Sequence, residues 1–218
     1  MTNNPFGYNS LMPVLLHLSS AFGLSASAGL NAYIPLLIIS IMARLGSIHL
    51  AAPYDLLGST WCLCLLVVLC IIEIIVDKIP GADHINDIVQ SFIRPTAGAI
   101  LFASQIGVIK GVHPAVWIVV GLVLAGGVHT AKALSRPVIN TASFGIGAPI
   151  VSALEDLVAT VTSLLAVLFP ILAGLFLVIA VWILIRAFRL FRRKRTARIP
   201  VSVQAVYVPD QPAWRGGI

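Results

Sequence analysis

The sequence predicts an all-α protein, a polytopic transmembrane helical bundle of about six spans, and two observations carry this prediction. First, 59% of the 218 residues are hydrophobic, only 10% are charged and the mean hydropathy is +1.01. A soluble domain carries about 25% charged residues, so this chain has too little polar surface to face water. Second, the apolar residues form continuous runs without strand-like alternation. Because lipid offers no partner for backbone amides, such runs favour helices over a barrel.

The first apolar stretch, residues 11–45, is too long for one span. A single helix of this length would reach roughly 52 Å, whereas the hydrocarbon core is about 30 Å thick. We therefore expect a broken first helix, with the break in the small-residue stretch 25–29 and a full span near residues 26–45.

Further spans are expected at about residues 59–77, 95–109 and 114–134. The last apolar tract, residues 149–190, has Pro170 near its centre and is predicted to form two spans that turn at Phe169–Pro170. This organisation gives a transmembrane domain over residues 1–190 and a basic, proline-containing cytoplasmic tail over residues 191–218.

The basic residues predict the orientation, because cytoplasmic loops carry an excess of Lys and Arg. With six spans and both termini on one side, the other side holds only Arg44 and Lys110. The side of the termini holds Lys78, Arg94, Lys132, Arg136, Arg186, Arg189, Arg192, Arg193, Lys194, Arg195, Arg198 and Arg215. Both termini are therefore predicted to be cytoplasmic. The basic tail is expected to attract anionic lipid headgroups and not nucleic acid.

A 3+3 inverted repeat is left open. Residues 29–31 and 127–129 could correspond in the two halves, since each lies in a span rich in small residues. The acidic pairs of the two halves, however, fall near the same membrane side, where strict inversion would not place them.

Four acidic residues lie inside apolar runs, namely Glu73, Asp77, Glu155 and Asp156. Ionisable groups at membrane depth are costly and by default face the bundle interior with a partner or a function. Glu73 and Asp77 are four residues apart, so their carboxylates share one helix face and repel each other unless a proton or a cation lies between them. This spacing predicts a cation or proton site. In the alternative interpretation, Lys78 neutralises Asp77 at the interface.

A second acidic pair follows the helix break expected at Pro80–Gly81. Asp83 and Asp87 are again four apart and His84 is adjacent, so with Glu73 and Asp77 they form a ligand set that suits a divalent cation. This cation is the one cofactor that the sequence indicates. Alternatively, Asp83 only caps the next helix, and Asp87 flanks an ordinary amphipathic turn.

Three basic or imidazole side chains, His129, Lys132 and Arg136, form a stripe at one end of the fourth predicted span. They could hold a phosphate or pair with the acids, or the two cations could be topology anchors and the imidazole a hydrogen-bonded interior group. Arg94 at the start of the third span joins this candidate site. Asn31 is either a neutral ligand or a helix–helix hydrogen bond.

Several of these segments together resemble the bacterial family filed as domain of unknown function 4126. The resemblance extends from about residue 23 to 181 and rests on residues 29–36, 73–84, 92–95, 97–99, 129–132 and 155–156. The resemblance implies a polytopic inner-membrane protein, and it does not indicate an activity.

The most favoured function is a secondary transporter or exchanger of a cation, coupled to protons, in which Glu73, Asp77, Glu155 and Asp156 bind the ion. A membrane-embedded metal-dependent enzyme acting on a lipid phosphate is the first alternative. A flippase or a structural protein, with lipid headgroups on Arg94, Lys132 and Arg136, is the second. The lipid bilayer is the expected partner, and a homo-oligomer is left open.

Overall fold

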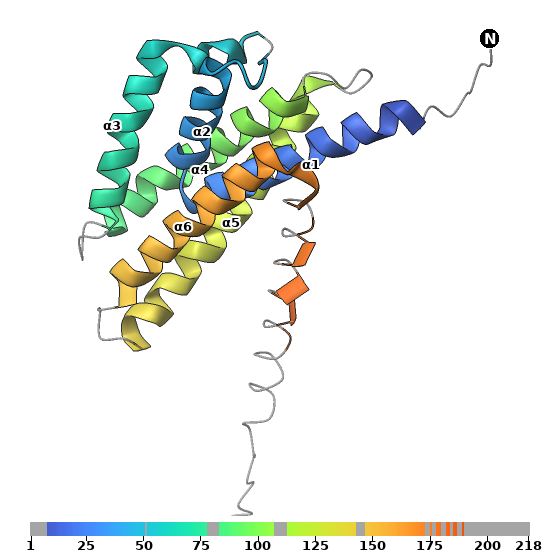
Figure 1. The fold of residues 1–218 in the computed structure, drawn as a ribbon. Coiled ribbons are helices and arrows are strands. Elements are labelled where there is room, and N and C mark those ends of the chain that lie inside the picture. Colours follow the sequence, from blue (N-terminus) through green and yellow to red (C-terminus); the bar gives the residue numbers. More distant parts are fainter. Residues whose placement is uncertain are drawn as a thin grey trace, which may run out of the picture. The chain divides into compact units, whose positions relative to one another are not determined.

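The computed structural model describes residues 8–50, 52–77, 83–106, 113–142 and 147–172, and single positions from there to residue 189, and these residues are helical without any strand (Figure 1). The elements are α1 (Tyr8–Leu30), α2 (Tyr33–Arg44), the 3-10 helix η1 (Tyr54–Gly58), α3 (Thr60–Val76), α4 (Asp83–Ile106), α5 (Pro114–Ala142) and α6 (Gly147–Leu168). The prediction of an all-α protein is therefore confirmed.

Three of these helices are long and apolar enough to cross a membrane, over residues 12–30, 114–139 and 149–168, and two shorter apolar helices are α2 and α3. The fold is that of a helical membrane bundle, while the count of six spans and the inverted repeat stay predictions. The chain divides into two compact units, residues 1–179 and 180–218. Residues 191–218, the predicted tail, lie outside the described part of the chain.

The break in the first apolar stretch lies at Asn31–Ala32, so the prediction of a break within residues 25–29 and of a full span over 26–45 is wrong. The serines of this stretch remain helical because their hydroxyls have partners. Ser25 Oγ donates to the Gly121 carbonyl at 2.9 Å and Ser27 Oγ donates to the Leu24 carbonyl at 2.8 Å. The next helix begins at Tyr33, and Asn31 Oδ1 accepts from the backbone N–H groups of Tyr33 and Ile34 in its first turn, at 3.1 and 3.2 Å.

Helices α3 and α6 follow the predicted spans, but α4 (Asp83–Ile106) begins well before the predicted span 95–109 and α5 (Pro114–Ala142) ends beyond 114–134. Arg94 therefore lies within α4, whereas the sequence predicts it at the start of a span. Helix α3 agrees with the predicted span 59–77 and begins where Ser59 Oγ accepts from the Cys62 N–H at 3.3 Å. Helix α4 begins at Asp83, after the expected Pro80–Gly81 break, and continues through Pro95. Helix α6 ends at Leu168, directly before the turn predicted at Phe169–Pro170.

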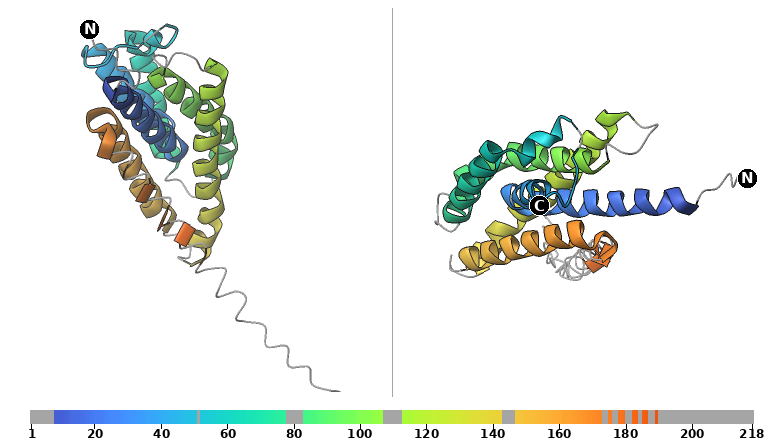
Figure 2. Two further views of the ribbon diagram at one scale, coloured as in Figure 1. Left: turned by 90° about the vertical axis from the view of Figure 1, so that its right-hand side faces the viewer. Right: turned by 45° about the horizontal axis from the view of Figure 1, so that its top comes forward.

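The C-terminal part of α1 is buried in contact with α4, α5 and α6, whereas its N-terminal end projects beyond them (Figure 2). Small residues allow these backbones to approach closely. A Cβ atom added to Gly98 would overlap Ala125 Cβ and lie 2.9 Å from Ser25 Oγ, and one added to Gly29 would lie 2.5 Å from the Ala125 carbonyl oxygen. This packing brings the polar residues near the end of α1 against α5 and α6.

Replacing Gly121 by alanine is expected to destabilise the protein, because the new Cβ would lie 2.5 Å from the Gly98 carbonyl oxygen and 2.6 Å from Phe102 Cβ. Such overpacking costs typically about 1–3 kcal/mol. The matched control is Gly127→Ala on the same helix, where a Cβ would meet no atom within 4 Å and alanine favours the helix by about 0.5–1 kcal/mol. Thermal unfolding in detergent checks the pair, and equal unfolding temperatures for the two variants would contradict the packing described here.

Candidate functional site

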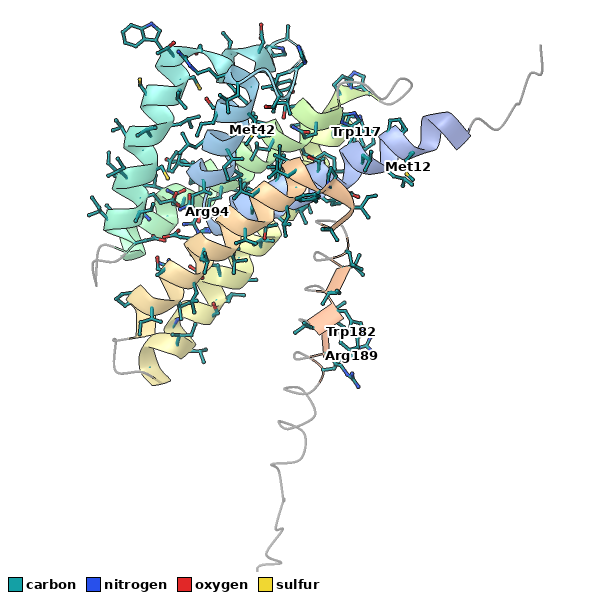
Figure 3. The ribbon with its side chains drawn as sticks, viewed as in Figure 1. Met12, Met42, Arg94, Trp117, Trp182 and Arg189 are labelled. Carbon is teal, nitrogen blue, oxygen red and sulfur yellow. The ribbon has the colours of Figure 1, made fainter. Side chains whose placement is uncertain are left out.

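Charged side chains from four helices meet inside the bundle and form one cluster, of which Arg94 is labelled in Figure 3. Arg94, on α4, is 0% exposed, and Glu73, on α3, is 2% exposed. We call this group the charge cluster, and its members are Glu73, Asp77, Arg94, His129, Lys132, Arg136 and Glu155. Buried charged groups need a partner of opposite charge or a hydrogen-bond partner, and these side chains pair with one another.

Arg94 joins an acid on α3 to an imidazole on α5. Its Nη2 donates to Glu73 Oε1 at 2.8 Å and lies 3.7 Å from Asp77 Oδ2, while its Nη1 lies 3.2 Å from His129 Nδ1. Because a guanidinium has donors only, His129 Nδ1 must be the acceptor. The ring proton is therefore assigned to Nε2, which lies 3.0 Å from Ser91 Oγ, and His129 is neutral in this arrangement.

Asp77, at the C-terminal end of α3, is the centre of the cluster. Its Oδ2 accepts from Lys132 Nζ at 3.2 Å and from Arg136 Nη2 at 3.0 Å. Its Oδ1 accepts from Asn86 Nδ2 at 2.7 Å, and Ser152 Oγ donates to Oδ2 at 3.4 Å. One carboxylate thus contacts side chains from three other helices, α4, α5 and α6.

Lys132 connects the charge cluster to the break between α1 and α2. Its Nζ donates to the carbonyl of Leu30, the last residue of α1, at 2.9 Å. It also lies 2.8 Å from Glu155 Oε2, an ion pair without the geometry of a hydrogen bond. Beside it, Asn31 Nδ2 donates to Asp156 Oδ1 at 2.9 Å. The non-helical backbone at the break is therefore satisfied by side chains, as the membrane interior requires.

All nine side chains predicted to bind a substrate or ion belong to the charge cluster or to the adjoining Asn31–Asp156 pair, namely Glu73, Asp77, Glu155, Asp156, His129, Asn31, Lys132, Arg136 and Arg94. The sequence predicts a proton or a bound cation between the carboxylates of Glu73 and Asp77. In the structure the cations beside these carboxylates are side chains of the protein, Arg94, Lys132 and Arg136.

The interpretation of Lys132 and Arg136 as mere topology anchors is wrong. Arg94, Lys132 and Arg136 are all buried and paired with acids, so each has a structural role inside the bundle. Without them the side of the termini still carries Lys78 and the basic residues from Arg186 onward, against Arg44 and Lys110. The predicted orientation therefore rests mainly on the tail.

Of the five residues predicted to bind a metal ion, the structure describes the side chains of two, Glu73 and Asp77. Asp83, His84 and Asp87 lie in the first turns of α4, but their side chains lie outside the described ones, so their part in a metal site stays a prediction. Glu73 and Asp77 are engaged by Arg94 and by Lys132 and Arg136. Within the described part of the chain, no group of three or more His, Cys, Asp or Glu residues could hold a metal ion.

The site is completed by three further polar residues, Asn86, Gln90 and Ser152. Asn86, Gln90 and Arg94 follow one another at four-residue spacing, which places them on one face of α4. Ser152 lies one helical turn before Glu155 and Asp156 on α6. The four-residue spacing of polar residues leading to Arg94 is the signal by which Gln90 could have been found.

Fold and site together define a helical membrane protein with a paired set of acids and cations in its interior. The chain belongs to the family described as Domain of unknown function (DUF4126), whose profile matches residues 18–190. The resemblance found in the sequence is thereby confirmed as to family. Neither a curated protein nor a solved structure matches the chain significantly.

Proposed function

We propose that the protein is a secondary transporter that exchanges a cation for protons, with the charge cluster as its coupling site. The observation that carries this proposal is the position of Arg94, which contacts Glu73 and His129 at once. We further propose a bacterial inner membrane as its location, with both termini in the cytoplasm.

Stability alone is a poor reason for such a cluster. Removing two charges from water costs several kcal/mol per ion, and replacing a buried ion pair by apolar residues is often neutral or stabilising. Both side chains of the Arg94–Glu73 pair are at most 1% exposed. Ionisable groups held at this depth commonly serve ion pathways and proton relays.

Both contacts of Arg94 depend on where protons are bound. A proton on Glu73 would remove the charge that attracts the guanidinium, which lies at 2.8 Å. A proton on His129 Nδ1 would turn the acceptor at 3.2 Å into a donor, so this contact with Arg94 would be lost. Protonation of either group therefore shifts Arg94 toward the other, and a shared cation with two alternative partners is a two-state element that proton binding can bias.

The same carboxylates account for exchange. Among the described side chains, the charge cluster and the adjoining Asn31–Asp156 pair hold four acids (Glu73, Asp77, Glu155 and Asp156) and three cations (Arg94, Lys132 and Arg136). The one excess negative charge can be neutralised by a proton or by a monovalent cation. Because the two ligands compete for it, binding of one favours release of the other, which is the requirement for coupled exchange.

The test is proton flux in proteoliposomes that contain a pH-sensitive dye, with gradients of Na⁺, K⁺ and Li⁺ imposed in turn. The wild-type protein is expected to move protons against at least one of these ions, and Glu73→Gln is expected to abolish this flux. The matched control is Asp55→Asn, which changes an exposed acid in η1 and should leave the flux unchanged. Wild-type flux in Glu73→Gln, or no flux in the wild type with any of the ions, would contradict the proposal.

A further inference from the structure

Four buried polar atoms in or beside the charge cluster have no hydrogen-bond partner among the described residues. Glu155 Oε2 still lies 2.8 Å from Lys132 Nζ, and the other three are Glu73 Oε2, Gln90 Oε1 and Arg94 Nε. The side chains of these three are at most 2% exposed. A buried polar group without a hydrogen-bond partner destabilises the fold, so three such atoms close together indicate a bound ligand.

These atoms come from side chains that lie next to one another. Arg94 contacts Glu73 at 2.8 Å, and Gln90 precedes Arg94 by one turn on the same face of α4. Tyr33, at the start of α2, lies near Gln90, Glu73 and Arg94. Four side chains from α2, α3 and α4 thus share one region of the interior.

We propose that this region is the binding site of one ordered water molecule. Water would donate its two protons to Glu73 Oε2 and Gln90 Oε1 and accept from the Arg94 Nε–H, so all three atoms would be satisfied. Buried waters typically make about three hydrogen bonds of this kind. If the Gln90 amide is turned over, the water accepts from its NH₂ group in place of donating, and the site still fits.

The chemistry of the site selects water over an ion. The Arg94 guanidinium repels a metal cation, and the carboxylate of Glu73 repels an anion. An ammonium ion has no lone pair with which to accept from Arg94 Nε. Water supplies donors and acceptors together, which the mixed set of partners requires.

The water would give Glu73 a second connection, besides the one through Arg94 to His129. It would link Glu73 Oε2 to Gln90, which lies near Tyr33. In this role, which rests on the proposed function, the water stays hydrogen-bonded to Glu73 Oε2 whether that carboxyl group is charged or protonated, because water can donate to it or accept from it. The binding site itself does not depend on transport.

X-ray hydroxyl-radical footprinting of the full-length protein, read by mass spectrometry, tests the site. A bound water generates the radical in place, so Tyr33 should be labelled several-fold faster than its 8% exposure allows. The dry reference is Phe102, which is 0% exposed and packs on the rings of Phe22 and Trp117 at 5.0 and 6.1 Å. Labelling of Tyr33 at the slow rate of Phe102 in the wild type would overturn the proposal.

The variant Gln90→Leu removes one partner of the water and should reduce Tyr33 labelling several-fold, toward the rate of Phe102. The matched control is Gln105→Leu on the same helix, whose Oε1 accepts from Ser20 Oγ at 3.3 Å, and it should leave Tyr33 labelling unchanged. An unchanged Tyr33 rate in folded Gln90→Leu would also overturn the proposal. Footprinting is independent of flux, so its failure would not be confused with failure of the transport proposal.

Discussion

Replacing Arg94 by methionine is expected to lower the stability of the protein more than any exposed substitution. The change leaves Glu73 buried without its ion-pair partner at 2.8 Å, and loss of one member of a buried pair costs about 3–5 kcal/mol. Thermal unfolding in detergent, followed by tryptophan fluorescence, measures the effect. The matched control is Arg44→Met, because Arg44 is an exposed arginine bonded to Thr60 Oγ1 at 2.6 Å, and its effect should stay within about 0.5 kcal/mol.

The double variant Glu73→Met with Arg94→Met extends this prediction. Neither charge then has to be desolvated, and apolar replacement of a buried pair is often neutral or stabilising. We expect the double variant to recover most of the stability that Arg94→Met loses. If it unfolds at the same temperature as the single variant, the two side chains are not an energetic unit.

Replacing Asp77 by asparagine is the second substitution with a large expected effect. Asparagine keeps the shape and an acceptor for Asn86 but removes the charge that Lys132 and Arg136 contact at 3.2 and 3.0 Å. Two buried cations would then depend on Glu155, which lies 2.8 and 3.6 Å away. The expected loss is again about 3–5 kcal/mol.

The same unfolding assay tests this substitution, with Asp55→Asn as the matched control for the exchange of an acid for its amide. Asp55 is exposed and its Oδ1 accepts only from the neighbouring Leu56 N–H among the bonds described, so its removal should have little effect. An Asp77→Asn protein as stable as Asp55→Asn would show that Asp77 does not hold the cluster together.

Much of the candidate site was predictable from the sequence, for a physical reason. A charge inside an apolar run has no good solvent in the membrane, so Glu73, Asp77, Glu155 and Asp156 had to face the interior. The sequence could not show their partners, because Arg94 and Lys132 reach them from other helices. Ion pairs between helices depend on packing that no local spacing reveals.

The errors in the sequence analysis have the same origin. The run of small residues at 25–29 has the composition of a break, but Ser25 bonds to α5 and the neighbouring Gly29 allows close helix contact. The true break at Asn31 is held by Asp156 and by Lys132, both on distant segments. Counting basic residues for orientation likewise treats buried and exposed cations alike, and burial is a property of the folded chain.

We propose that the charge cluster serves proton-coupled transport in addition to stabilising the fold. The most direct measurement compares proton flux and unfolding temperature in the double variant Glu73→Met with Arg94→Met, reconstituted in proteoliposomes beside the wild type. We expect a folded protein of near wild-type stability that moves no protons, because the proposed proton-binding pair Glu73–Arg94 is absent. A stable double variant with wild-type proton flux would contradict the claim.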